Sequence, residues 1–327
     1  MSTRRRTKGG AVAAAAVLLA VGALAACSAD RQDAGADARA AGSAAPLPPP
    51  PIGAVPVLAA DVANRALPID PYLLNRDQRG QLEAAVRMVT EHCMAGFGFG
   101  YHVPAGIDTG FTPATRTANR YLVSDPAFAA QYGYHAKAQP PVPPRADPPT
   151  GAMAVALSGS TDPGVKPGSQ GAPGGQDING RTVPRGGCVG EALDRTGASA
   201  QNGNGGDDRL ARDLDAQAWE ASKTDGRVLA AFRSWSDCMK AQGYTYGTPI
   251  EANADPQWAA GAVASAQERA TATADARCKV QANVVGVWFT VESAYESVLI
   301  EQHAEALAAV KQDIDKRMRM AAQAVAS

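Results

Sequence analysis

Apolar residues recur at helical spacing along most of the chain that follows residue 67. The first such stretch predicts a helix that begins after Asn75 or Asp77, both favourable helix caps, and is stopped by Gly96 and Gly98. Its apolar positions lie three or four residues apart and therefore share one face. They are Leu82, Ala85, Val86, Val89 and Cys93.

The same spacing continues from residue 208 to the C-terminus. Asp255 and Pro256 are typical of a helix start, with the aspartate as cap and the proline in the first turn. The segment from Val284 to Ala326 has no proline and a single glycine, which predicts one helix about 60 Å long. We therefore predict a mainly α fold with short β segments and a long C-terminal helix (284–327), whose second half is a candidate coiled coil.

Proline and glycine interrupt this pattern between residues 138 and 187. Ten of each occur in these 50 positions, a content that excludes a regular helix or a central strand. We interpret the segment as a long surface excursion, within which Met153–Gly159 is a candidate short strand.

One short pattern occurs twice. "EHCMAGFGFGY" (91–101) and "SDCMKAQGYTY" (236–246) share Cys-Met, a glycine and an aromatic exit, and an Asp-Pro pair follows each of them. We interpret residues 67–283 as a helical domain built from two related units. The alternative is that a cysteine, a glycine stop and an aromatic exit are a common way to end a helix.

The N-terminus predicts export and lipidation. Residues 1–26 combine a basic head with an apolar run that is short for a membrane span but typical of a secretory signal peptide. Leu24–Cys27 resembles a bacterial lipobox, so we expect Cys27 to carry the lipid and to begin the mature protein. The alternatives are a simple N-terminal membrane anchor, or cleavage elsewhere that leaves Cys27 as a thiol.

Residues 27–66 are rich in Ala and Pro and predict a disordered tether. The membrane, through the N-terminal lipid, is thus an expected partner, and the expected location is the outer face of the cytoplasmic membrane. Cleavage leaves 27 Lys and Arg against 32 Asp and Glu, a net charge of −5, which argues against nucleic-acid binding.

Four cysteines remain for an oxidising compartment, where an even number predicts two disulfide bonds. Three pairings are possible. The repeated pattern favours bonds within units, Cys93–Cys188 and Cys238–Cys278. Bonds between units, Cys93–Cys238 and Cys188–Cys278, are the main competitor.

We expect no catalytic residue, no metal site and no cofactor. His92 adjoins Cys93, but neighbouring residues of a helix point about 100° apart and cannot form a nucleophile and base unaided. A soft-metal site at these residues with Met94, Cys238 and Met239 lacks a Cys-x-x-Cys or a histidine pair at ligand spacing.

The chain resembles a family of uncharacterised cell-envelope lipoproteins of high-GC Gram-positive bacteria. The residues that carry the resemblance are the lipobox (24–27), the two Cys-Met units, "RGGCVGEA" (185–192), "TADARCK" (273–279) and "NVVGVWFTVESAY" (283–295). The resemblance implies location and fold, and it transfers no catalytic residue.

Two functions fit these patterns. The first is a non-enzymatic accessory or interaction module of the cell envelope, which meets an envelope protein through the C-terminal helix. The second is a binding module for a cell-wall glycan or a small ligand, with aromatic rings that stack on sugars. Its candidate residues are Phe97, Phe99, Tyr101, Tyr244 and Tyr246.

Overall fold

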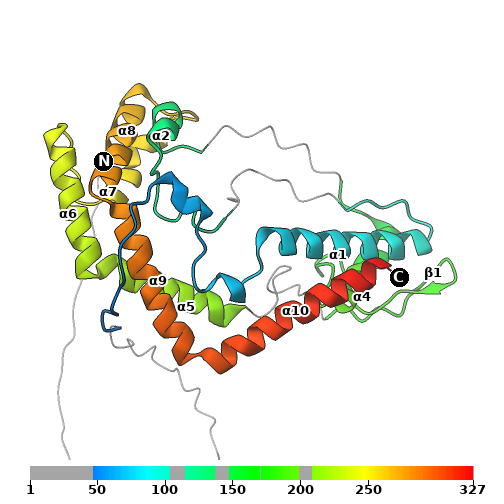
Figure 1. Cartoon of the computed structure of the whole chain (residues 1–327). Coiled ribbons are helices and arrows are strands. Elements are labelled where there is room, and N and C mark those ends of the chain that lie inside the picture. The colour runs from blue at the N-terminus through cyan, green and yellow to red at the C-terminus, as the bar shows by residue number, and fades with distance from the viewer. Residues whose placement is uncertain (1–46, 104–114, 137–146, 170, 199–207, 327) are drawn as a thin grey trace, which may run out of the picture. The chain divides into compact units, whose positions relative to one another are not determined.

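The computed structural model describes residues 47–103, 115–136, 147–169, 171–198 and 208–326, and this part of the chain is mainly helical, as predicted (Figure 1). In chain order the α-helices are α1 (Arg76–Gly96), α2 (Pro126–Tyr132), α3 (Gly151–Ser158), α4 (Gly187–Thr196), α5 (Arg209–Thr224), α6 (Gly226–Ala241), α7 (Pro249–Asn253), α8 (Ala266–Gln281), α9 (Val284–Gln302) and α10 (Ala304–Ala326). Shorter 3₁₀ helices are η1 (Ala60–Asn64), η2 (Asp70–Tyr72) and η3 (Pro256–Ala260). One antiparallel pair of strands is described, β1 (Asp177–Ile178) with β2 (Arg181–Thr182).

The largest hydrophobic cluster lies between α5, α6 and α9. Trp288 of α9 is completely buried at its centre and stacks on Trp219 of α5, with ring centroids 4.6 Å apart. Phe232 of α6 and Tyr121 meet the same ring edge-on. The indole nitrogen of Trp288 donates a hydrogen bond to Ser222 Oγ at 2.9 Å, so this large side chain is buried without an unpaired polar atom.

A second cluster lies between α1, α3 and α4 and includes Cys93 and Cys188. The short hairpin β1–β2 adjoins it through a two-residue turn in which Asn179 and Gly180 both have positive φ, as a tight hairpin requires. The Asn179 side chain donates a hydrogen bond to the Phe97 carbonyl at 2.7 Å and so fixes the hairpin to the end of α1.

Two disulfide bonds join helices, and both follow the pairing within units. Cys93–Cys188 connects α1 with α4, and Cys238–Cys278 connects α6 with α8. The predicted disulfide-stapled helical fold is thereby confirmed. In the chain-entropy account, the second bond closes a loop of about 40 residues and contributes roughly 3–4 kcal/mol to stability.

The repeated stretch forms the same backbone structure twice. At the end of α1 the Phe99 N–H donates to the Met94 carbonyl at 3.1 Å, and at the end of α6 the Tyr244 N–H donates to the Met239 carbonyl at 3.0 Å. Both bonds belong to the Schellman ending of a helix, which needs one left-handed residue. That residue is a glycine in each copy, Gly98 and Gly243.

The second pair of matching positions also has one role in both copies. Asp125 caps α2 by accepting from the Ala127 N–H, and Asp255 caps η3 by accepting from the Gln257 N–H. However, α2 packs on α8 through small buried residues, whereas α1 packs on α4 and α10. The two copies are therefore similar in local structure but do not fold as two consecutive, separate units.

The C-terminal segment differs from the single helix that its spacing predicts. It is divided at His303 into α9 and α10, because the His303 backbone leaves helical geometry with φ −119° and ψ 21° before the helix restarts one residue later. The long C-terminal helix of the fold is thus α10, with 23 residues. No glycine or proline marks the break, so the sequence pattern does not reveal it.

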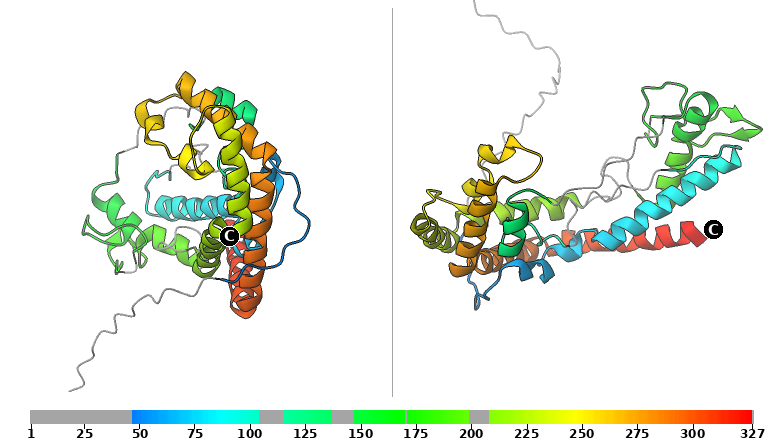
Figure 2. Two further views of the ribbon diagram at one scale, coloured as in Figure 1. Left: turned by 90° about the vertical axis from the view of Figure 1, so that its left-hand side faces the viewer. Right: turned by 90° about the horizontal axis from the view of Figure 1, so that it is seen from above.

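The apolar side of α10 is covered, which corrects the expectation that this stripe is exposed for a partner. Ile314 and Ala321 of α10 are buried against Leu82 and Ala85 of α1, and α10 also contacts α4. Figures 1 and 2 show α10 and α1 side by side in different views. The coiled-coil face that we predicted is therefore used inside the chain.

The tether is shorter than the predicted range of 27–66. Residues 27–46 lie outside the described part of the chain, but residues 47–66 pack on the helices. Leu58 and Val62 are 1 % exposed within the main core. The Asn283 side chain accepts from the Leu58 N–H at 3.1 Å and donates to the Pro56 carbonyl at 2.9 Å. These contacts provide hydrogen-bond partners for backbone N–H and C=O groups in a segment that has no regular structure.

The excursion at 138–187 is partly ordered. Residues 137–146 and 170 lie outside the described part, whereas α3 and the hairpin β1–β2 occupy much of the remainder. Met153–Gly159 is not a strand: residues 151–158 form α3, which ends at a left-handed Gly159. Its run of small and apolar residues suits a helix buried on several sides as well as a buried strand.

The packing of α10 predicts the effect of truncation. A chain that ends after Gln302 loses the cover over α1, so we expect a lower melting temperature and faster amide exchange in α1 and α4 than in α5 and α9. Hydrogen exchange with mass spectrometry checks this. Unchanged exchange in α1 would show that α10 does not stabilise that helix.

Candidate functional site

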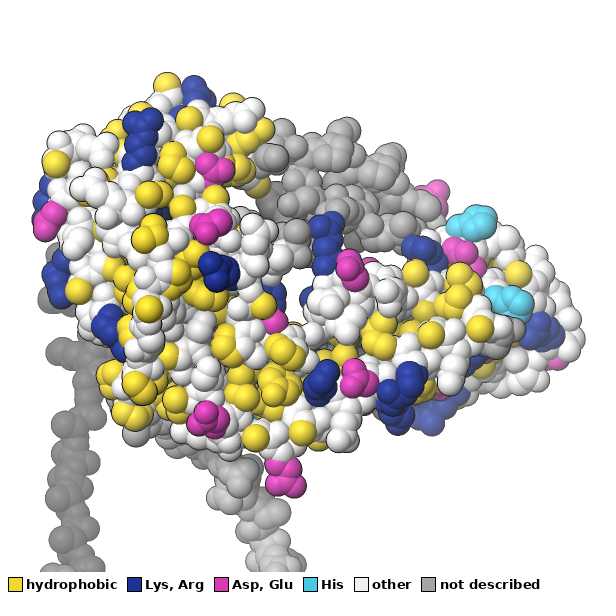
Figure 3. All heavy atoms as spheres, viewed as in Figure 1, with side chains coloured by type: hydrophobic (Ala, Val, Ile, Leu, Met, Phe, Trp, Pro, Cys, Tyr) yellow, Lys and Arg dark blue, Asp and Glu magenta, His cyan; other side chains and the backbone are white. Residues whose placement is uncertain are grey.

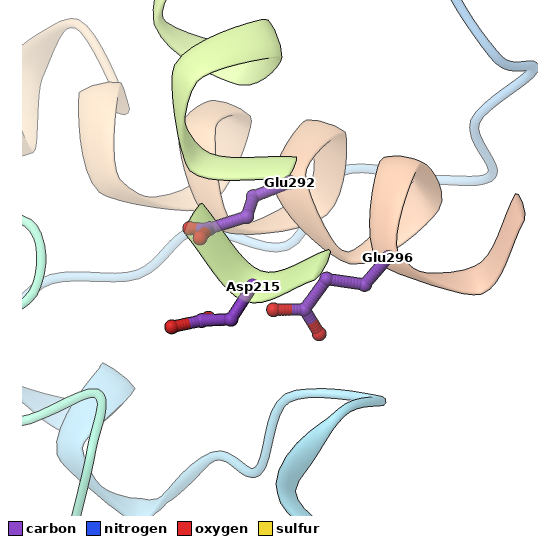
Figure 4. A group of neighbouring side chains, drawn as sticks. All are labelled: Asp215, Glu292 and Glu296. Atoms are coloured by element: carbon purple, nitrogen blue, oxygen red, sulfur yellow. The ribbon is translucent and has the colours of Figure 1, made fainter. Parts of the chain in front are cut away.

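Three carboxylate side chains lie close together where α5 meets α9 (Figure 4). Asp215 comes from α5, and Glu292 and Glu296 lie one turn apart on the same face of α9. One oxygen of each lies within 4.8 Å of the others. We call these three residues the carboxylate cluster. Like charges at this separation and burial are costly unless cations or protons compensate for them.

Two arginines supply most of that compensation. Arg120 donates from Nη2 to Asp215 Oδ1 at 2.7 Å and from Nε to Glu292 Oε1 at 2.7 Å. Arg116 places Nη2 2.6 Å from Asp215 Oδ2 and Nη1 2.7 Å from Asp70 Oδ1. Burial of Arg120 opposes its charge, yet the hydrogen bond and charge of Glu292 raise the pKa of the guanidinium overall.

Glu292 has a third partner. The Tyr121 hydroxyl donates to Glu292 Oε2 at 2.7 Å, and burial together with the charge of Glu292 raises the pKa of Tyr121. Both oxygens of Glu292 therefore accept hydrogen bonds. Burial raises the pKa of Glu292 and Arg120 opposes this shift. These contacts hold the segment that carries Arg120 and Tyr121 against α5 and α9.

Glu296 is the exception in the cluster. It is 1 % exposed, and its Oε2 accepts from the Ile69 N–H at 3.0 Å, but within the described residues its Oε1 has no hydrogen-bond partner. Burial, followed by the charge of Glu292, raises the pKa of Glu296 to about 9. The carboxyl group is therefore protonated at neutral pH, which lowers the negative charge of the cluster.

The contacts decide what the cluster can do chemically. A hard cation such as Ca²⁺ needs several carboxylate oxygens that are open to it. Here the oxygens of Asp215 and Glu292 already accept from Arg116, Arg120 and Tyr121. Guanidinium groups thus occupy the position that a cation would take. The arrangement is a buried network that joins chain segments.

A pocket adjoins this network on the side of Asp70 and Arg116. It has a volume of ≈ 330 Å³, and we call it the arginine pocket. Its lining combines four arginines with a leucine floor and several polar groups. The lining residues are Asn64, Arg65, Ala66, Asp70, Leu73, Leu74, Asn75, Arg76, Arg79, Thr115 and Arg116.

A second, more open pocket of ≈ 430 Å³ lies beside the Cys238–Cys278 disulfide. We call it the Tyr244 pocket. Gln242 donates from its side chain to Cys278 Sγ at 2.9 Å and so lies between the pocket and the disulfide. The lining residues are Ala130, Gln242, Tyr244, Arg269, Ala270, Thr273, Ala274 and Arg277.

The five aromatic residues predicted to bind a ligand do not form one site. Phe97 is 2 % exposed and lies with Phe99 and Tyr101 in the cluster of α1 and α4. Tyr244 and Tyr246 instead pack on the main core. These rings therefore serve the fold, and Tyr244 also lines a pocket.

Tyr246 illustrates why an aromatic side chain in a loop need not bind a ligand. Its hydroxyl donates to Asp255 Oδ2 at 2.8 Å and accepts from Gln257 Nε2 at 3.1 Å. Burial and the hydrogen bond to Asp255 raise the pKa of Tyr246 to about 12. The ring thus connects the end of α6 to η3.

The predicted covalent sites divide into two sets. Cys93, Cys188, Cys238 and Cys278 are all disulfide-bonded. Cys27, the predicted lipidation site, lies outside the described part of the chain. In that part, no helix has both the length and the apolar character that a membrane span requires.

The sequence reasoning missed the carboxylate cluster and both arginines. One signal was present: Glu292 and Glu296 are separated by one helical turn within an otherwise apolar segment of α9. Acidic residues on a buried helical face need partners from elsewhere in the chain. The spacing does not identify Arg120 as that partner, because the arginine lies in a segment without regular structure.

Comparison of the chain with models of protein families, with curated proteins and with solved structures found no match.

The state of Glu296 predicts a pH dependence of stability. Between pH 4.5 and about 9 the folded protein holds a proton that the unfolded chain releases, so stability falls as pH rises through this window. Glu296→Gln keeps the acceptor for Ile69 and removes the titration. We expect the variant to be more stable than the wild type by about 3 kcal/mol at pH 7, with the difference vanishing near pH 4.

Urea unfolding between pH 4 and pH 9 measures this effect. Glu301→Gln is the matched control, because Glu301 lies on the same helix and is exposed. Parallel curves for the wild type and Glu296→Gln would contradict a protonated buried carboxyl group.

Proposed function

We propose that this chain is a lipoprotein tethered to the outer face of the cytoplasmic membrane, where it acts as a non-enzymatic accessory or interaction module of the cell envelope. The observation that carries the proposal is the pair of disulfide bonds between helices. Such bonds persist in oxidising compartments, which agrees with export by the predicted signal peptide. They also remove the four thiols from nucleophilic chemistry.

The histidines support a non-catalytic role. His135 donates from Nδ1 to Glu268 Oε1 at 2.7 Å and from Nε2 to the Gly261 carbonyl oxygen at 3.0 Å, so both ring nitrogens are engaged. The hydrogen bond to Glu268 raises the pKa of His135. His92 and His102 are exposed. The two ring nitrogens of His135 thus serve contacts within the fold.

An envelope partner would meet the polar side of α10, since its apolar side packs on α1 and α4. Lys311, Lys316 and Arg319 are exposed along this helix, and Asp315 lies among them. Figure 3 shows lysine and arginine side chains gathered over the stretch where α10 runs. Contacts of this kind are sensitive to salt and suit reversible association.

Lipidation is the first test of this proposal. Cells that express the chain with radiolabelled palmitate should label it and retain it in the membrane fraction, and Cys27→Ala should abolish the label. Membrane retention of the unlabelled variant would indicate a simple N-terminal anchor, and an unlabelled wild type would refute the lipoprotein assignment.

A second candidate function is binding of a cell-wall glycan or a small ligand, and the Tyr244 pocket favours it. The pocket places one aromatic ring beside Gln242, Thr273, Arg269 and Arg277. A ring that stacks on a sugar and polar groups that bind its hydroxyls are typical of carbohydrate sites.

Pull-down with insoluble cell-wall polymer tests this candidate. The wild type should be retained and Tyr244→Ala released, whereas Phe99→Ala, which changes a ring packed on the α1 and α4 cluster, should remain bound if it is folded. Equal retention of wild type and Tyr244→Ala would exclude the Tyr244 pocket as the glycan site.

A further inference from the structure

We propose that the arginine pocket binds a small phosphorylated amphiphile, with the phosphoryl group held by arginines and a short apolar segment placed on the leucine floor. This site is distinct from the Tyr244 pocket and does not depend on the lipidation of Cys27. Its walls come from three parts of the chain: the end of η1, the segment from η2 to the start of α1, and residues 115–116.

The charge of the lining is the first argument. Four arginines face one acidic residue, Asp70. Both oxygens of Asp70 are engaged, Oδ1 by Arg116 and Oδ2 by the Leu67 N–H at 2.8 Å. Arg65 is exposed and pairs with no carboxylate in the described part of the chain. Since Arg116 also pairs with Asp215, the positive excess that an oxyanion would neutralise comes from Arg65 and Arg79.

The chemistry of the donors favours a phosphoryl group. A guanidinium group has five N–H donors in a planar fork, and it binds phosphate oxygens in pairs. Arg79 donates from Nη2 to the Leu74 carbonyl at 3.0 Å, which positions its guanidinium group beside the pocket. The other N–H groups of this guanidinium remain available to a ligand. Several oxygens on one phosphorus atom can therefore meet two arginines at once.

The backbone around the pocket is fixed before any ligand arrives. Thr115 Oγ donates to the Ala63 carbonyl at 2.6 Å, and Thr117 Oγ donates to the Arg65 carbonyl at 2.7 Å. Arg116 is held from behind by Asp215 of the carboxylate cluster. Less conformational entropy is lost on binding when the site is ordered in advance.

The apolar floor distinguishes this pocket from a site for inorganic phosphate alone. Leu74 is 3 % exposed and Leu73 is half-buried against the main core, so both side chains are held in place. A volume of ≈ 330 Å³ exceeds what a single phosphate ion fills. A short alkyl chain beside the phosphoryl group would remove the exposed part of Leu73 from water.

Two sources offer this chemistry, a soluble organophosphate and the headgroup region of a phospholipid. Hexyl phosphate is the soluble probe, and vesicles of phosphatidylcholine with phosphatidylglycerol represent the lipid. The protein is the full chain with Cys27→Ser, so that no acyl group contributes to vesicle binding. Hexanol and inorganic phosphate test the apolar and ionic parts separately.

Calorimetric titration at low ionic strength should show saturable binding of hexyl phosphate. The affinities for hexanol and for inorganic phosphate should each be at least tenfold weaker. The double variant Arg65→Ala/Arg79→Ala should weaken binding of hexyl phosphate at least tenfold. The single variant Arg65→Ala, which keeps the Arg79 bond to Leu74, should weaken it severalfold. Arg233→Ala removes an exposed arginine of α6 outside the pocket and should change the affinity less than twofold.

If the protein also binds the vesicles, and the arginine variants abolish that binding, the ligand is a lipid headgroup. If it binds hexyl phosphate but not the vesicles, the ligand is a soluble organophosphate. Absence of saturable hexyl phosphate binding would overturn the proposal. So would equal affinity in the folded Arg65→Ala variant, or equal affinity for hexanol.

Discussion

Two disulfide bonds impose the constraint on which the helical fold depends. Each begins at a cysteine near the C-terminal end of a helix, where a left-handed glycine lets the chain leave at once. The methionine that follows each cysteine, Met94 or Met239, is completely buried and accepts the closing hydrogen bond of the Schellman ending. The repeated sequence thus fixes where a helix stops and which helix it is joined to, so the cysteines serve the fold.

Buried polar side chains of α8 and α9 form the second constraint, because they hold segments without regular structure. Lys279 and Asp275 of α8 are completely buried as an ion pair at 2.9 Å, and Lys279 also donates to the Val123 carbonyl. Glu292 holds Arg120, and Glu296 accepts from the Ile69 N–H. Removal of one partner from such a pair leaves an uncompensated charge and costs more than the intact pair contributes.

These contacts also connect the fold to the arginine pocket. Arg116 lies between Asp215 in the carboxylate cluster and Asp70 in the pocket wall. Asp215 of α5 therefore orients Arg116, which lines the pocket. A ligand in the pocket would be bound by side chains whose positions are fixed by the core.

The predictable features were those encoded by local sequence. Asn75 as cap, Gly98 and Gly243 as stops, and the cysteine pairs all follow from short patterns with a clear physical role. Features that depend on distant segments were not predictable. The break at His303 contains no glycine or proline. The apolar stripe of α10 does not indicate from sequence whether a partner protein or α1 covers it.

The candidate site failed to emerge from the sequence for the same reason. Arg120 and Glu292 are far apart in the chain, and aromatic residues after a helix look alike whether they line a pocket or pack on a core, as Tyr244 and Phe97 show.

Peptide mass spectrometry without reduction, on protein purified from cells that express the chain, tests the account most directly. The account predicts peptides that join Cys93 to Cys188 and Cys238 to Cys278, with no mixed pairs. Thiols at Cys93 and Cys238, or a bond between these two residues, would contradict it, because the repeated stretch would then serve a redox or metal site or link the two copies instead of ending and joining helices.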